Sequence, residues 1–125
     1  MTETPPTGWQ DYVVEFKPKI FMWEILVPTV RMDGTGYYRT RYHRVWDEKV
    51  RAITGGLTIM PPAKGQWVSE DDDELFVERM IPVRVAATEA QLEAITDMTL
   101  EYYDQRTVLA YKISDDVRFK NRKPK

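Results

Sequence analysis

The carboxylate of Glu78 is the side chain in this sequence best suited to chemistry. Glu78 lies between Val77 and Met80 in a segment rich in apolar and β-branched residues. A glutamate in such surroundings is seldom buried unless it is paired, and the adjacent Arg79 would point to the opposite face of a strand. Glu78 therefore reaches solvent, meets a charge from another element, or faces a ligand. In the last case it is a candidate catalytic residue.

An aromatic candidate precedes it, in the tripeptide Gly65-Gln66-Trp67. Glycine allows a sharp turn of the backbone, and tryptophan then offers a large face that could cover a ligand or a cation. Packing of Trp67 on a helix or on a neighbouring subunit is the competing interpretation. If the tripeptide meets a ligand, Gln66 and Trp67 are substrate-binding residues.

Two more carboxylates, Glu101 and Asp104, have the spacing of residues on one face of a helix, near its C-terminal end. A carboxylate there opposes the helix dipole by about 0.3–1 kcal/mol. Such an unfavourable placement can indicate function, although a solvated helix face is the commoner outcome.

The remaining polar groups favour ordinary roles. His43 is the only histidine, and no orienting partner can be assigned to it, which argues against a catalytic triad. The run Asp71-Asp72-Asp73 lacks the spacing of a calcium loop and indicates a solvated turn. The absence of cysteine excludes a thiolate zinc site. We expect neither a metal site nor a cofactor.

The hydropathy pattern predicts the elements that carry these residues. Residues 19–27 are apolar on both faces, which is typical of a central strand. Apolar residues then recur at helical spacing from Thr40 up to Gly55-Gly56. Residues 57–60 form a short strand, and residues 63–74 form a loop or a hairpin arm.

The second half of the chain repeats this order. Residues 75–87 form a strand, although Pro82 within it requires a bulge or an unpaired edge. Thr88 and Gln91 have the spacing of a capping box, which opens a helix that runs to about residue 105. Residues 107–114 form the last strand.

The order βαββαβ predicts an α+β, ferredoxin-like fold with an antiparallel sheet. Right-handed crossovers place both helices on one face of that sheet. Trp23, Phe76 and Met80 are candidates for the other face, which nothing in the sequence covers. Another subunit usually closes such a face, so we expect a homo-oligomer.

The length and the charge pattern of the sequence indicate how the chain is divided. The sequence divides into an N-terminal arm (1–18), one α+β domain (19–115) and a basic tail (116–125). No apolar segment is long enough to span a membrane, and the N-terminus lacks the pattern of a signal peptide. We expect a cytoplasmic protein. The net charge of −2 does not favour nucleic-acid binding.

Short motifs between residues 56 and 112 resemble those of two families. A bacterial family of uncharacterised domains has a similar pattern over about half the chain, and this resemblance implies no activity. The matching residues are Gly56-Leu57-Thr58, Gly65-Gln66-Trp67, Glu78-Arg79 and Gln105 with Val108-Leu109.

The second resemblance is to the phage S-adenosylmethionine lyases. It rests on Gly65-Gln66-Trp67, on Glu78 ahead of a Val-Arg-Val strand, and on Tyr103-Asp104-Gln105 ahead of 108–112. The resemblance implies a trimer of ferredoxin-like subunits with sites between the subunits. It also implies cleavage of S-adenosylmethionine to methylthioadenosine and homoserine lactone, in which the substrate's own carboxylate attacks.

In this interpretation Glu78 and Glu101 are catalytic, and four residues bind the substrate: Gln66, Trp67, Asp104 and Gln105. The family's tyrosine is matched here by Trp67, which has no hydroxyl. The alternative is therefore a non-catalytic module that binds a small nucleotide, or a phage-type interaction module.

Overall fold

The computed structural model describes residues 18–124, which excludes most of the predicted N-terminal arm. It confirms the α+β, ferredoxin-like fold, with one strand more than the sequence pattern predicted. The elements in chain order are β1 (Phe21–Pro28), α1 (Thr40–Thr54), β2 (Thr58–Ile59), β3 (Ala63–Val68), β4 (Leu75–Ala87), α2 (Glu89–Tyr102) and β5 (Ala110–Ser114).

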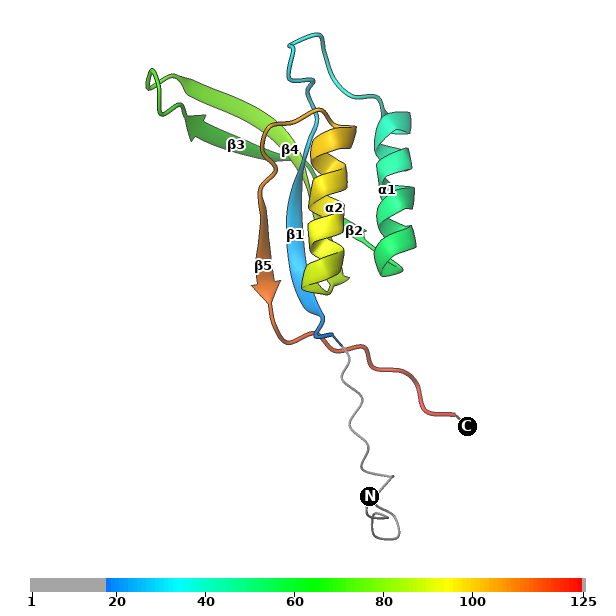
Figure 1. Cartoon of the computed structure of the whole chain (residues 1–125). Helices are drawn as coiled ribbons and strands as arrows, with labels where there is room; N and C mark the ends of the chain where they lie inside the picture. Colours follow the sequence, from blue (N-terminus) through cyan, green and yellow to red (C-terminus); the bar gives the residue numbers. More distant parts are fainter. Residues whose placement is uncertain (1–17, 125) are drawn as a thin grey trace, which may run out of the picture.

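The sheet is antiparallel throughout, with the strand order β2-β4-β1-β5. Both helices lie on one face of the sheet, and no helix of residues 18–124 lies on the other face (Figure 1). The additional strand, β3, pairs only with the first half of β4. The region predicted as a loop or a hairpin arm is therefore a hairpin arm.

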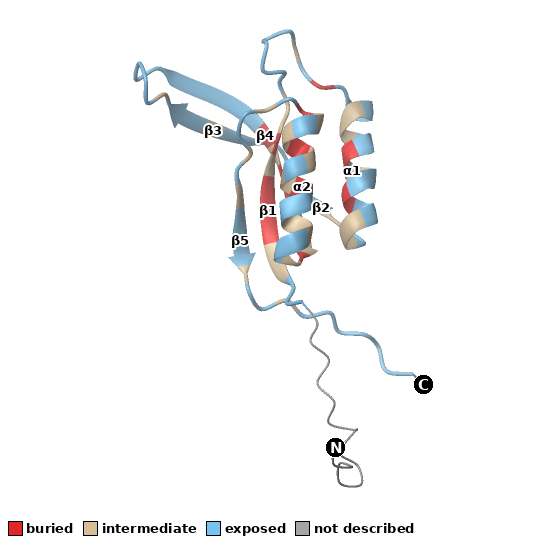
Figure 2. Ribbon diagram, in the orientation of Figure 1, coloured by how far each residue is buried: buried red, intermediate tan, exposed pale blue. Residues whose placement is uncertain are grey.

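The core lies between the sheet and the helices (Figure 2). Alternate residues of β1 and β4 point into it, because successive side chains of a strand face opposite ways. Ile25 opposite Val83, and Trp23 opposite Val85, form two such buried pairs. The helices contribute Trp46, Val50 and Ile95 to the same core.

The prediction that Trp23 faces the open side of the sheet is wrong. Its side chain has the orientation of Ile25, two residues further along β1, and is therefore buried under the helices. The indole nitrogen donates a hydrogen bond to the carbonyl of Ala87 at 2.9 Å. Met80 and Phe76 alternate with the core residues of β4, as predicted for the open side.

Pro82 lies inside β4 without breaking the sheet. On this edge the pairing with β3 ends at Met80 and the pairing with β2 begins at Val83. Pro82 accepts a hydrogen bond from the backbone N–H of Met60 at 2.9 Å. The N–H that proline lacks falls in the gap between two partner strands, which confirms the expected unpaired position.

The end of α2 differs from the prediction. The capping box of Thr88 and Gln91 is present, but the helix ends at Tyr102 because Asp104 takes a left-handed conformation with φ 49°. The N–H of Gln105 bonds to the carbonyl of Leu100 at 2.9 Å, which is a Schellman helix end. Asp104 therefore lies beyond the helix, and the prediction that it shares a helix face with Glu101 is wrong.

Within residues 18–124, no helix is long and apolar enough to cross a membrane.

Candidate functional site

The candidate site lies beside a hairpin that extends beyond the main sheet (Figure 1). We call this hairpin, formed by β3 and residues 75–79 of β4, the arm. The strand β1 does not pair with the arm, because β1 ends at Pro28, opposite Met80. Trp67 lies opposite Phe76 on the arm.

Glu78 is two residues from Phe76 and lies directly opposite Gly65. Because side chains alternate along a strand, Glu78, Phe76 and Trp67 all belong to one face of the arm. The arm therefore carries the carboxylate and the indole that the sequence singled out on the same surface.

Gly65 has a different role from the predicted one. It lies within β3 rather than at a sharp turn. A Cβ atom at this position would come within 2.4 Å of the Met80 methyl carbon and within 3.2 Å of the Trp67 indole nitrogen. A larger residue at position 65 would therefore have to displace the flexible end of the Met80 side chain and would press against the Trp67 indole.

An open apolar cavity of about 370 Å³ lies on this face of the arm. Its size is within the range of small-molecule sites, about 300–1,000 Å³. Trp67 and Glu78 line it from the arm, Leu26 from β1, and Met32 from the loop that follows β1. The connection between α2 and β5 supplies the remaining wall, at positions 105–109.

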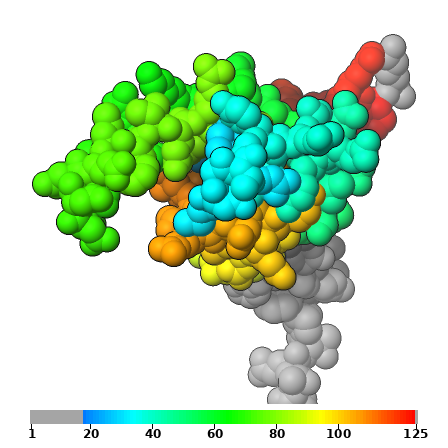
Figure 3. All heavy atoms as spheres, turned by 90° about the horizontal axis from the view of Figure 1, so that it is seen from above, coloured from blue at the N-terminus to red at the C-terminus, as the bar shows by residue number. Residues whose placement is uncertain are grey.

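A second cavity of about 600 Å³ continues from the first, towards the loop of residues 29–37. Glu78 and Gln105 line both cavities. The second one is more polar, since Arg31 borders it together with Lys64 and Arg79, which belong to the arm face opposite to Trp67 and Glu78. We call the two cavities together the cleft; the arm (green), the loop (cyan) and the α2–β5 connection (orange) surround it in Figure 3.

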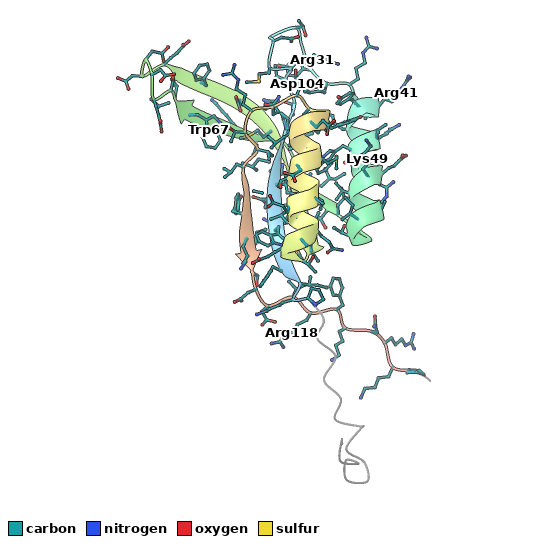
Figure 4. The ribbon with its side chains drawn as sticks, viewed as in Figure 1. Arg31, Arg41, Lys49, Trp67, Asp104 and Arg118 are labelled. Atoms are coloured by element: carbon teal, nitrogen blue, oxygen red, sulfur yellow. The ribbon has the colours of Figure 1, made fainter. Side chains whose placement is uncertain are left out.

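Three of the six predicted site residues come together in the cleft, namely Trp67, Glu78 and Gln105. Gln66 lies opposite Val77 and belongs to the other face of the arm. Figure 4 shows Trp67 on the arm and Asp104 at the same end of the molecule.

Glu101 and Asp104 are exposed and line neither cavity. The sequence pattern did not indicate that the cations at Arg31, Lys64 and Arg79 line the cleft. The alternation of the strands could have placed Lys64 beside Arg79, but only if the register of the arm had been known.

Gln105 is held in place by a buried aromatic cluster behind it. Its side-chain amide donates to the carbonyl of Tyr103 at 3.1 Å, and the Tyr38 hydroxyl donates to the same carbonyl at 2.5 Å. Burial raises the pKa of both Tyr38 and Tyr103, so both phenols stay protonated at neutral pH. Tyr38 also stacks on Tyr42, with ring centroids 4.9 Å apart.

The chemistry that the cleft offers is binding rather than nucleophilic attack. Trp67 and Phe76 provide aromatic surface, and Glu78 provides one negative charge beside it. This combination suits a flat or cationic ligand. No group of three metal-ligating side chains occurs in the part of the chain that the structure describes.

Comparisons with known proteins give a likeness in structure only. No family model and no curated protein matches the sequence. A phage S-adenosylmethionine lyase in complex with S-methyl-5′-thioadenosine is similar, with a TM-score of 0.57 and 14% identity over 81% of this chain and 94% of that chain.

CutA1 proteins are similar to the same degree. CutA1 from Shewanella sp. has a TM-score of 0.60 and 8% identity over 83% of this chain and 88% of that chain. The divalent cation tolerance protein from Thermus thermophilus has a TM-score of 0.58 and 10% identity over 82% and 87%. At these identities the likeness shows the fold alone. The chain has the ferredoxin-like fold of these proteins, and its resemblance to the phage lyases is a distant one.

Proposed function

We propose that this protein binds S-adenosylmethionine in the cleft and cleaves it to methylthioadenosine and homoserine lactone. The observation that carries the proposal is that Trp67, Glu78 and Gln105 line one cavity although they come from separate segments. These residues also carry the motif resemblance to the phage lyases. The likeness to CutA1 is equally strong in fold, so the residues of the cleft and not the fold support this activity.

The reaction needs no nucleophile from the protein. A carboxylate oxygen of the substrate attacks its own γ-carbon, the carbon–sulfur bond breaks, and the electron pair stays on sulfur. The sulfonium becomes a neutral thioether, so no proton is gained or lost. Because the step joins opposite charges, apolar surroundings such as Trp67, Phe76 and Leu109 favour it over water. Glu78 would bind the cationic part of the substrate.

Glu101 has no direct place in this proposal as a cleft residue. It lies on the exposed side of α2, and a role in catalysis would require an approach from a second copy of the chain. The same holds for Gln66, which faces away from the cavity on the arm. Both roles stay predictions that depend on assembly.

The test is to incubate the protein with S-adenosylmethionine and to follow methylthioadenosine by chromatography, with calorimetry of the same mixture. Formation of methylthioadenosine at a rate above the spontaneous rate supports the proposal. If the mixture shows no methylthioadenosine and no binding, both the proposed activity and the proposed ligand are ruled out. A matched sample of the Glu78→Gln variant controls for a contaminating enzyme.

The second candidate is a non-catalytic module that binds a small adenosyl or nucleotide ligand. The observation in its favour is Trp67, which has no hydroxyl at the position of the lyase tyrosine. Calorimetric binding of S-adenosylmethionine without turnover would select this candidate.

Self-association is part of the proposal, and the arm supports it. A two-stranded hairpin is marginally stable alone in water, yet within residues 18–124 the arm pairs with no further strand. Its side chains are apolar on both faces. Five of them are between 40% and 62% exposed: Trp67, Val68, Leu75, Phe76 and Val77. We infer that a second copy of the chain covers the arm, with the trimer of the phage-lyase resemblance as the expected assembly.

A further inference from the structure

The polar cavity of the cleft concentrates positive charge. Three cationic side chains border it, at Arg31, Lys64 and Arg79, against the single carboxylate of Glu78. The chain as a whole has a net charge of −2. This local excess of cations is therefore a property of the cleft and not of the overall composition.

Two of these cations lie side by side. Lys64 and Arg79 are directly opposite each other on β3 and β4, which places their Cβ atoms about 4.5–5.5 Å apart. Among the described ion pairs neither residue has a partner. Like charges directly opposite each other destabilise a strand pair, so the arm carries a cost that a bound anion would remove.

Other groups around this pair can also contact an anion. Tyr37 borders the same cavity with a side chain that is 71% exposed, and its hydroxyl can donate a hydrogen bond. Arg31 is held nearby, with its guanidinium 4.7 Å from the centre of the Tyr38 ring. Arg79 is fixed by its backbone, since its carbonyl accepts a hydrogen bond from the Thr29 hydroxyl at 2.6 Å.

We propose that Lys64 and Arg79 form a subsite for an oxyanion group of the ligand, a carboxylate or a phosphate. The anion lies in the polar cavity, beside the arm face that carries Lys64 and Arg79, while the flat part of the ligand lies against Trp67 on the opposite arm face. The ligand therefore passes the free edge of β4, which β1 leaves unpaired before Met80. Glu78, which borders both cavities, separates the two parts and faces any cationic centre between them. The position of the flat part rests on the proposed function, whereas the anion contact follows from the two cations alone.

Four probes at constant ionic strength test this subsite by calorimetry: adenosine, S-adenosylhomocysteine with its carboxylate, adenosine monophosphate with its phosphate, and inorganic phosphate. We expect one or both anionic nucleosides to bind more tightly than adenosine. Lys64→Gln and Arg79→Gln should each weaken that binding roughly fivefold, as for a solvent-exposed ion pair, and leave adenosine unchanged. Arg44→Gln, an exposed substitution on α1, is the matched control.

The better of the two anionic nucleosides identifies the oxyanion as a carboxylate or a phosphate. Equal affinity of adenosine and both anionic nucleosides, or no effect of either substitution, overturns the subsite and leaves the proposed function standing. If no nucleoside binds, the proposed function falls, and inorganic phosphate decides the subsite. Saturable shifts of the Lys64 and Arg79 amide NMR signals on addition of phosphate, which disappear in Arg79→Gln, support the subsite. The absence of such shifts overturns the subsite.

Discussion

The Nδ1 atom of His43 lies 2.6 Å from the hydroxyl oxygen of Tyr103. This contact joins α1 to the end of α2, behind the segment that presents Gln105 to the cleft. Because burial raises the pKa of Tyr103, its hydroxyl stays protonated and donates the hydrogen bond. His43 accepts it as the neutral imidazole, with its own proton on Nε2.

This contact predicts a loss of stability in mild acid. Burial lowers the pKa of His43, although the carboxylate of Asp47 acts in the opposite direction. The unfolded chain therefore binds the proton first, and the free energy of unfolding falls as the pH decreases below about 6.5. One proton gives a slope of at most about 1.4 kcal/mol per pH unit, and solvent screening at this half-buried site reduces it.

Urea unfolding between pH 7.5 and pH 5 measures that slope. His43→Gln should remove most of it. Burial raises the pKa of Asp47 in both proteins, so the comparison cancels the part of the Asp47 contribution that does not depend on the His43 charge. The same pH dependence in both proteins would show that His43 is not the titrating group.

The buried hydrogen bond between the helices gives a second prediction. The Trp46 indole donates to the Thr99 hydroxyl at 3.0 Å, and both residues are buried. Thr99→Val keeps the shape but leaves the indole N–H without a partner, so it should destabilise the domain by about 1–3 kcal/mol. Thr99→Ser keeps the hydroxyl and is the control. Equal unfolding midpoints in urea for the Val and Ser variants would contradict this assignment.

Glu78→Gln should leave the fold intact and remove ligand binding. Glu78 is exposed on the arm and is in none of the described ion pairs, so the expected change in stability is within about 0.5 kcal/mol. Binding is lost because the amide keeps the shape of the side chain but not its charge. The measurements are the melting temperature and the calorimetric affinity for S-adenosylmethionine.

Glu93→Gln, an exposed substitution on α2, is the control for that experiment. A clear drop in the melting temperature of Glu78→Gln would assign Glu78 to structure. Unchanged affinity would also remove it from the site.

Trp67 gives a prediction that separates binding from turnover. Trp67→Tyr supplies the hydroxyl of the phage-lyase pattern, whereas Trp67→Phe keeps an aromatic ring without a hydroxyl. We expect both variants to bind S-adenosylmethionine and the tyrosine variant to form methylthioadenosine faster than the phenylalanine variant. Equal rates would mean that a hydroxyl at this position has no part in the reaction.

The exposed arm predicts a concentration-dependent assembly. Val68→Lys combined with Leu75→Lys adds two charges to one directly opposite pair on the arm, and charged residues block the pairing of strands between molecules. Light scattering at micromolar concentration should report an oligomer for the original protein and a monomer for this variant. Val45→Lys, an exposed change on α1, should leave the oligomer unchanged. A monomeric original protein would refute the assembly.

Local sequence signals were sufficient for most of the fold. The alternation around Ile25, the capping box at Thr88 and the glycine after α1 each depend on neighbours within a few residues. The exception was the end of α2, where Asp104 adopts the left-handed conformation that glycine usually supplies. No signal in the sequence distinguished Asp104 from a residue that continues the helix.

The candidate site was predictable only in part. Trp67, Glu78 and Gln105 were chosen by residue type and by motif, and the structure brings them together. Gln66 was chosen with them but faces the other side of the arm, because neighbouring residues of a strand alternate.

By itself, the sequence determined the order of the helices and of the strands that flank them, and the chemical types available for a site. The tertiary structure decided which of them meet. The register of β3 on β4 sets Lys64 against Arg79 and Trp67 against Phe76, and the early end of β1 leaves the arm without a neighbour on that edge. Strand register and contacts between separate segments depend on the packing of the whole chain, whereas propensity and periodicity are local.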